Sequence, residues 1–528
     1  MSKPRAIIIG LDGFELSLAE RLLGEGRLPA LKRMQETGAS LLLDHGRAKR
    51  TGLAWEHVST GLSPDRAKRW AAIDFDPATY GVVQRPTSLK PFAASLGCRT
   101  VVFDPPYFNL AQASSVRGLV SWGAHDPGVP QISQPAGLAE EIRAKFGAYP
   151  ATEWIYGFVW PDAAKARRMA DEIVGAVHLR NDITAWMLSE RLPDWDLAYV
   201  VISEYHSANE SLWHGVDASH PLAGLPSAEP ARAGLEGVYE AADKMLGDLM
   251  ARFPDANVVA FNLHGMGTND SDVASMALLP ELLYRHRFGR ARLKSGGWPT
   301  LDSGVPLINS QQRWGEEVID AIGPRAFADR ARSRLRRTLG RQAPTAPMGD
   351  GLSLDWMPAS RYAPDWPYMN AFALPAYYDG RVRVNLKGRE ARGTVPLSAY
   401  DAVCDEVEAL IRECRNIFTG EPVVREIDRA ERPAAELAVS EADLIVVWNG
   451  APLGLSHPRL GQIGPLPYHR TGGHSGRDGA AYFAGPSVKA GRYPVHSAFD
   501  VLPTVLELVG EPTAADVSGT AIRDLIAS

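Results

Sequence analysis

The clearest apolar run in the chain lies near its start and ends at a single carboxylate. Residues 6–9 are Ala-Ile-Ile-Ile, four consecutive apolar residues of which three are β-branched. This pattern predicts a strand that is buried on both faces, as in a parallel sheet. Asp12 follows between Gly10 and Gly13, at the carboxyl edge where open α/β sheets bind their ligands. Asp12 can therefore hold a ligand, or it can be an ordinary cap of the next helix.

Apolar runs and helical spacings continue along the chain. Short apolar runs predict further strands at 41–43, 99–103, 198–202, 258–261 and 444–447. The remaining patterns predict two helical pieces within 15–38 and helices at 164–190 and 232–252. The helix at 232–252 has one apolar face, so we expect it to cover a sheet.

Polar side chains gather where several of these strands end. They are Glu204, His206, Glu210 and His214 after one strand, Asn262 and His264 after another, and His474 in a late glycine-rich turn. Such groups can bind a metal or move protons, and a purely structural loop seldom concentrates them in this way. A lone histidine is usually structural, but three at predicted sheet edges beside Asp12 indicate a functional site.

Thr51 lies in a turn that follows the strand at 41–43. A hydroxyl at a strand-to-helix turn can cap the helix, which is the commoner use of threonine. It can also be a nucleophile presented to the sheet edge, with the amides of the helix start around it. The residue pattern by itself leaves both interpretations open.

Composition and charge narrow the range of partners. The chain has 528 residues, 45% of them hydrophobic, which is enough for a large core or for two domains. Its net charge of −6 gives no electrostatic reason to expect a nucleic acid polymer as a partner. The cysteines, Cys98, Cys404 and Cys414, have no metal-type spacing and are typical of reduced cytosolic thiols.

Two absences from the sequence bear on location. No secretory signal precedes the first predicted strand, and no apolar stretch approaches the roughly 18 to 20 residues of a membrane span. We therefore expect a cytoplasmic protein without a membrane partner. The oligomeric state has no signature in the sequence.

A set of motifs in fixed order resembles the alkaline phosphatase superfamily, and within it the type I phosphodiesterase and nucleotide pyrophosphatase family. They are Leu-Asp-Gly after the first strand, Gly-Arg-Leu-Pro-Ala-Leu at 26–31, Thr51 nine residues before Thr-Gly-Leu-Ser-Pro, His-Gly-Met at 264–266, a late Gly-X-His that ends at His474, and Asp-Val-Leu-Pro-Thr-Val-Leu-Glu-Leu-Val-Gly at 500–510. The segment Asn-Leu-Lys-Gly-Arg-Glu at 385–390 also looks like this family. The resemblance covers nearly the whole chain.

The resemblance implies the architecture of the protein. It implies an α/β fold, with an alkaline phosphatase-like core in which a mostly parallel central sheet carries helices on both faces. Residues 1–275 and 425–528 would form this catalytic core. Residues 276–424 would form an inserted cap that covers the substrate.

The resemblance also implies a site with two divalent metal ions, zinc or manganese, in which Thr51 attacks phosphorus. Asp12, Thr51, His264 and His474 fall on positions that the family uses for its metals. His206 and Glu210 stand where the family has an Asp and a His. Two divalent ions would neutralise phosphate oxygens and activate a hydroxyl nucleophile.

Leu263 departs from the pattern, because it occupies the position of the family's second Asp and has no metal-binding atom. Glu204, Asn262 or His214 could substitute for the missing carboxylate. We therefore expect one ion held firmly by His206, Glu210 and His474, with the second ion uncertain.

Two functions remain open. The first is a metal-dependent hydrolase of phosphodiester or pyrophosphate bonds in a small-molecule substrate, with Lys387 and Arg389 as candidate substrate-binding residues. The second is a binding protein on a decayed phosphatase fold, because of Leu263. A sulfatase is a lesser rival, since sulfatases use a modified Cys or Ser and no cysteine lies near Thr51.

An arginine-rich stretch in the predicted cap adds a further question. It carries Arg325, Arg330, Arg332, Arg334, Arg336, Arg337 and Arg341. Such a run is usually a solvated helix face, with phosphate binding as the alternative.

Overall fold

The computed structural model describes residues 4–124, 129–294, 296–323, 347–348, 351–476 and 478–527. The chain divides into two compact units. The first unit contains Met1–Lys68, Pro86–Gly267 and His474–Ser528, and the second contains Arg69–Arg85 and Thr268–Gly473. The arginine-rich stretch at 325–341 lies outside the described residues.

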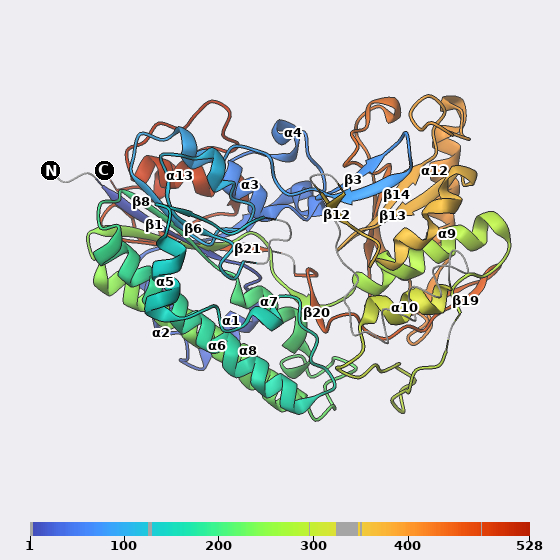
Figure 1. The fold of residues 1–528 in the computed structure, drawn as a ribbon, viewed down its shortest axis with the longest axis horizontal. Coiled ribbons are helices and arrows are strands. Elements are labelled where there is room, and N and C mark those ends of the chain that lie inside the picture. Colours follow the sequence, from blue (N-terminus) through green and yellow to red (C-terminus); the bar gives the residue numbers. More distant parts are fainter. Residues whose placement is uncertain are drawn as a thin grey trace. The chain divides into compact units, whose positions relative to one another are not determined.

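A ten-stranded sheet forms the centre of the first unit (Figure 1). Its strands are β1 (Arg5–Leu11), β2 (Ala39–Asp44), β5 (Thr100–Phe103), β6 (Arg117–Val120), β7 (Ile132–Gln134), β8 (Leu197–Ile202), β9 (Ala256–Asn262), β21 (Gly479–Ala484), β22 (Gly491–Arg492) and β23 (His496–Ser497). The spatial order is β22-β2-β21-β9-β1-β8-β5-β6-β7, and β23 pairs with β2. The five strands from β9 to β6 are parallel, whereas β21 and β7 pair antiparallel with their neighbours. The predicted α/β fold with a mostly parallel central sheet is confirmed.

Strand β1 lies in the middle of this sheet and is buried on both faces, as its apolar run predicts. Ile7 and Ile9 belong to the hydrophobic core on one face, and Ala6 and Ile8 belong to the core on the other. A side chain at Gly10 would lie within 2.5 Å of the Trp55 ring, so only glycine fits there.

Helices cover both faces of the sheet (Figure 1). One core is built with α1 (Leu16–Gly24), α2 (Pro29–Thr37), α5 (Leu138–Phe146), α6 (Ala163–Trp186), which continues as the π-helix η5 (Met187–Arg191), α7 (Glu204–Leu212) and α8 (Ala228–Arg252). The other core is built with α3 (Ala54–Thr60), η2 (Phe92–Ser95), η3 (Leu110–Gln112), η11 (Ala498–Asp500), α13 (Val501–Leu508) and η12 (Arg523–Leu525). Short helices in the same unit are η1 (Gly46–Thr51), α4 (Pro64–Ala67), η4 (Thr152–Trp154) and η6 (Trp213–Gly215).

The second unit contains small, mostly antiparallel sheets. One comprises β3 (Ile73–Asp76), β4 (Gly81–Gln84), β11 (Pro347–Met348) and β12 (Gly351–Ser353), the next β13 (Ala371–Leu374), β14 (Gly380–Val384), β16 (Val424–Arg429) and β17 (Leu444–Trp448), and the third β15 (Arg415–Asn416), β18 (Leu455–His457) and β19 (Gly461–Ile463). The two-residue strands β10 (Gly267–Thr268) and β20 (Gly472–Gly473) pair with each other. The helices among its described residues are η7 (Ala274–Leu278), α9 (Leu279–Phe288), α10 (Trp314–Ile322), η8 (Pro358–Tyr368), η9 (Leu397–Ala399), α12 (Tyr400–Arg412) and η10 (Ala434–Glu436).

The bounds of the second unit differ from the cap expected at 276–424. The unit extends back to residue 268, forward to residue 473, and includes the separate segment 69–85. The strand predicted at 444–447 exists as β17, but it pairs with β14 and β16 in the second unit. The role of this unit as a substrate-covering cap stays a prediction. Among the described residues, no helix combines the length and apolar character needed to cross a membrane.

Candidate functional site

The end of β1 packs directly against the first turn of α7. The Asp12 amide donates to the carbonyl oxygen of Ile202 at 3.2 Å, which continues the pairing with β8. Gly13 adopts a φ of +84°, and a Cβ there would lie 2.7 Å from the His206 Cα. A glycine is therefore needed at this position, since it allows the backbone after Asp12 to approach His206.

His206 is the centre of a buried polar cluster. His206 and Glu210 lie four residues apart on α7 and so share one face of the helix. The His206 Nε2 atom is 3.2 Å from Glu210 Oε1 and 3.2 Å from His474 Nε2. The opposite ring nitrogen, Nδ1, is 3.2 Å from Asp12 Oδ2. Asp12, His206 and Glu210 are each 5% exposed or less.

This arrangement fits one divalent metal ion. In the part of the chain that the structure describes, His206, Glu210 and His474 offer one ligand atom each, all within 4.8 Å of one another. Two imidazoles and a carboxylate are a common three-ligand set for a catalytic zinc ion, which keeps a fourth position open. Asp12 contacts the other nitrogen of His206, as carboxylates behind metal-binding histidines do.

A fully buried ion-pair network holds the start of α7. Arg180 on α6 donates to both carboxylate oxygens of Glu204 at 2.9 Å and to Asp104, which follows β5, at 2.9 Å. Asp104 also accepts the backbone amides of Trp122 and Gly123. Because both oxygens of Glu204 are paired in this network, the structure places Glu204 in a supporting role rather than in the metal cluster.

Thr51 is the last residue of the 3-10 turn η1 and is buried. Its hydroxyl donates to the Ala48 carbonyl at 2.8 Å and accepts the Leu53 amide at 3.0 Å. The N-cap of α3 is Leu53, so Thr51 is not the cap residue of that helix. The structure thus removes the simplest form of the capping interpretation.

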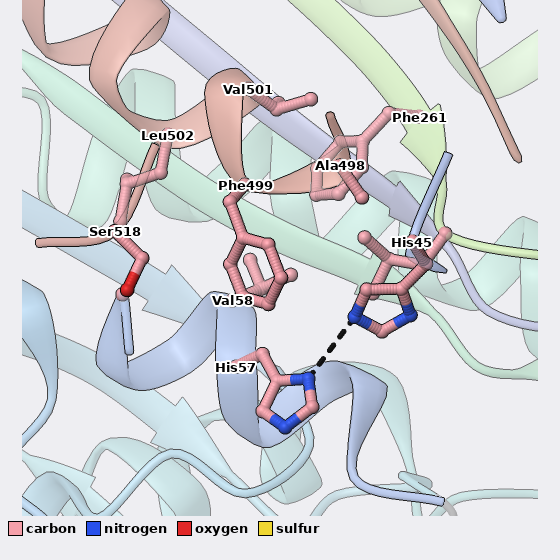
Figure 2. A pocket seen from close by; sticks show the side chains of 11 residues that line it. His45, His57, Val58, Phe261, Ala498, Phe499, Val501, Leu502 and Ser518 are labelled. Atoms are coloured by element: carbon pink, nitrogen blue, oxygen red, sulfur yellow. Dashed lines mark hydrogen bonds between the residues drawn. The ribbon is translucent and has the colours of Figure 1, made fainter. Parts of the chain in front are cut away.

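His57 lies next to Thr51, and His45 lies next to His57; neither histidine was expected from the sequence. The Nε2 atom of His57 is 3.5 Å from Thr51 Oγ1, and its Nδ1 is 3.1 Å from His45 Nε2. Figure 2 shows this pair beside Phe499, in a small pocket that Leu263 also lines. Burial lowers the pKa of His45 to about 4, so its ring is neutral near pH 7. His45 directly follows β2, and its place at a strand end was the signal that could have identified it.

The His264 ring lies near both pairs of histidines, His206 with His474 and His45 with His57. Its ring centroid is 5.2 Å from that of His474 and 6.4 Å from that of His45, and its Nδ1 is 3.3 Å from the Gly265 carbonyl oxygen. Burial holds the pKa of His264 well below its usual value. Leu263, one residue earlier, is buried and contributes no polar atom.

Lys49 joins the Thr51 turn to the His474 loop. Its Nζ donates to the carbonyl oxygen of Gly476, two residues after His474. Gly476 in turn lies so close to Gly265 that a Cβ on Gly476 would be 2.1 Å from the Gly265 carbonyl carbon. The ammonium group is thereby placed beside the segment that carries His264.

The remaining candidates are engaged elsewhere. Asn262 donates to the Phe14 carbonyl at 3.0 Å and accepts the Ala480 amide at 2.8 Å, so both ends of its amide support the sheet. The Nε2 of His214 is 3.0 Å from the Ser227 hydroxyl. In the second unit, Arg389 forms a two-pronged ion pair with Asp443, and Lys387 is exposed.

The comparison with known protein families gives one match. The sequence model of a family described as type I phosphodiesterase / nucleotide pyrophosphatase matches residues 6–336. No curated protein matches the sequence.

Similar solved structures include phosphonoacetate hydrolase from Sinorhizobium meliloti 1021 in complex with phosphonoformate. It is 14% identical, with 96% of this chain and 95% of that chain covered and a TM-score of 0.48. Human ectonucleotide pyrophosphatase/phosphodiesterase 5 is 11% identical, with 99% and 100% covered and a TM-score of 0.45. An inactive murine form of the latter protein, in complex with AMP, is 10% identical, with 99% and 100% covered and a TM-score of 0.47.

Proposed function

Because the chain belongs to the type I phosphodiesterase and nucleotide pyrophosphatase family, we propose that it is a metal-dependent hydrolase of phosphodiester or pyrophosphate bonds. The family as a whole hydrolyses phosphoesters and generally depends on divalent metals. The substrate that we propose is a small-molecule phosphoester, and cytoplasmic location stays a prediction.

One observation carries the proposal: ligand atoms of His206, Glu210 and His474 lie within 4.8 Å of one another, and Asp12, at the end of β1, contacts His206. These three residues would hold the metal ion, with Asp12 orienting His206 from behind. A divalent ion bound there would stabilise the negative charge that develops on the phosphoryl oxygens.

Thr51 is the proposed nucleophile. Its Oγ1 would form a bond to phosphorus while the bond from phosphorus to the leaving oxygen breaks, and water would then hydrolyse the phosphothreonine. The hydroxyl needs an acceptor for its proton, and His57 Nε2 lies 3.5 Å away. A catalytic contact of this length in a structure without substrate is compatible with that role, because such contacts tighten when substrate binds.

Replacing Thr51 tests the nucleophile. We expect Thr51→Ala to lower kcat by about a thousandfold or more, because no other hydroxyl takes over the covalent step. Thr51→Ser, which keeps a hydroxyl, should retain far more activity. The measurement is turnover of aryl phosphate monoesters, phosphodiesters and sulfates with zinc or manganese. Thr51→Ala with a large share of the wild-type rate would contradict the assignment.

Replacing Glu210 tests the metal site. We expect wild-type protein to contain one tightly bound divalent ion per chain, and Glu210→Ala to lose it, because the variant keeps two imidazole ligands and loses the carboxylate ligand. Glu441→Ala, a buried carboxylate of the second unit, serves as a control that should keep the ion. Elemental analysis gives the result, and two tightly held ions in the wild type would overturn the single-ion assignment.

Leu263 favours the alternative of a binding protein on a decayed phosphatase fold, since it removes a carboxylate that the family pattern supplies. One measurement, hydrolysis of the substrate panel, separates the hydrolase from the binding protein. A binding protein would bind phosphoesters without hydrolysing any member of the substrate panel at any metal concentration.

A further inference from the structure

The position that the family pattern gives to a second metal ion has lost one of its two carboxylates in this chain. Leu263 has no donor atom. Asp12 directs Oδ2 to His206, and His264 has its Nδ1 next to the Gly265 carbonyl. One oxygen of the remaining carboxylate, that of Asp12, already faces the His206 ring, so a second divalent ion would meet less negative charge here than in the family pattern.

The Lys49 side chain brings a positive charge of the protein itself to the same part of the site. Lys49 is two residues before Thr51 in the η1 turn, and its Nζ donates to the Gly476 carbonyl oxygen. Since Gly476 lies against Gly265, the Lys49 side chain links the turn that carries Thr51 to the segment that carries His264.

The electrostatic surroundings agree with this placement. Burial is the main cause that lowers the pKa of His264, and the Lys49 charge lowers it further. Burial is also the main cause that lowers the pKa of His45, and the Lys49 charge again lowers it further. Burial raises the pKa of Glu15 overall, and Lys49 acts in the opposite direction. The Lys49 charge thus acts on the pKa values of His264, His45 and Glu15.

We propose that the Lys49 ammonium supplies the second positive charge of the site, in place of a second divalent ion. This inference rests on the hydrolase function proposed above. A lysine ammonium is a compact point charge with three donors, so it can bind a phosphoryl oxygen and offset its charge without any ligands of its own. The ammonium also repels a divalent ion. Without a second ion to bind, the site does not need a carboxylate at position 263.

Metal counting tests the exclusion without depending on activity. Wild type, Lys49→Met and Leu263→Asp should each hold one zinc ion per chain, because in Leu263→Asp the new carboxylate pairs with the ammonium. The double variant Lys49→Met/Leu263→Asp has the carboxylate and lacks the repulsion, and it should hold two. A second ion in Leu263→Asp alone, or one ion in the double variant, would overturn the proposal. Thermal unfolding of each variant shows whether it is folded.

Kinetics test the contribution to the reaction. With one zinc ion still bound, Lys49→Met should lower kcat about a hundredfold, in the range seen when one charge-stabilising donor is removed. Lys49→Arg should recover part of the loss. Lys32→Met, which removes an exposed lysine of α2, is the matched control and should leave kcat unchanged. A kcat of Lys49→Met close to that of wild type would refute the role.

The two sets of measurements separate this inference from the function on which it rests. If the wild type hydrolyses nothing, the hydrolase proposal fails, and the metal counts still decide whether Lys49 excludes a second ion. If the wild type is active and Lys49→Met is equally active, the role of Lys49 fails while the hydrolase proposal stands.

Discussion

His214 shows how a single buried residue ties stability to pH. Its ring is buried and shares a hydrogen bond with the Ser227 hydroxyl. Burial, with a smaller contribution from His220, lowers the pKa of His214 to about 3. An unfolded histidine has a pKa near 6.5, so between about pH 6.5 and 3 the unfolded state binds a proton that the folded state does not. Stability must therefore fall as the pH falls through this window.

We expect His214 to account for about 2 kcal/mol of the unfolding free energy lost between pH 6.5 and pH 5. His214→Gln keeps a polar group for Ser227 but does not titrate, so its stability should fall less steeply over the same range. Urea unfolding at several pH values measures both slopes. Equal slopes in the two proteins would contradict the assignment.

The candidate site residues differ in how easily each can be identified from the sequence. Asp12, His206, Glu210 and His474 could be identified because they follow strands or lie in a glycine-rich turn, where side chains meet at one sheet edge. The support role of Glu204 could not, because its partner Arg180 is 24 residues away on another helix. The position of His57 beside Thr51 depends on the η1 turn, whose geometry has no periodic signature.

At the scale of elements, Arg180 connects α6 to the ends of β5 and β8. Arg180, Asp104 and Glu204 are all fully buried. Removal of the guanidinium leaves two buried carboxylates without their cation, so Arg180→Ala should cost about 3–5 kcal/mol of unfolding free energy. Arg167→Ala, on the same helix, removes an exposed partner of Glu229 and should cost less than about 1 kcal/mol.

Chemical denaturation of the two variants gives the comparison, and Arg180→Lys provides a version that keeps the charge and loses the two-pronged contact. Similar losses in Arg180→Ala and Arg167→Ala would show that the network does not hold α7.

The elements themselves were largely predictable. The helices at 164–190 and 232–252 exist as α6 and α8, because long periodic apolar patterns define helices well.

For the whole molecule, the α/β class and the parallel centre of the sheet followed from the sequence, but the bounds of the two units did not. Strands β3 and β4 lie in the second unit because β4 pairs with β12, more than 260 residues later in the chain. Strand β17 has the same apolar pattern as a core strand, yet its partners are β14 and β16. Local patterns specify that a strand forms and leave its distant partner open.

The position of β21 has a consequence for biosynthesis. This strand lies between β2 and β9 and is what connects them, but it follows the long insertion at 268–473. During translation, the edge of β9 stays without its partner strand β21 until about 200 further residues have been made. This takes roughly ten seconds or more at 5–20 residues per second. During that time the nascent chain exposes an unpaired edge, a template for aggregation. Chaperone-poor expression should therefore lower the yield of soluble protein more than its final stability would suggest.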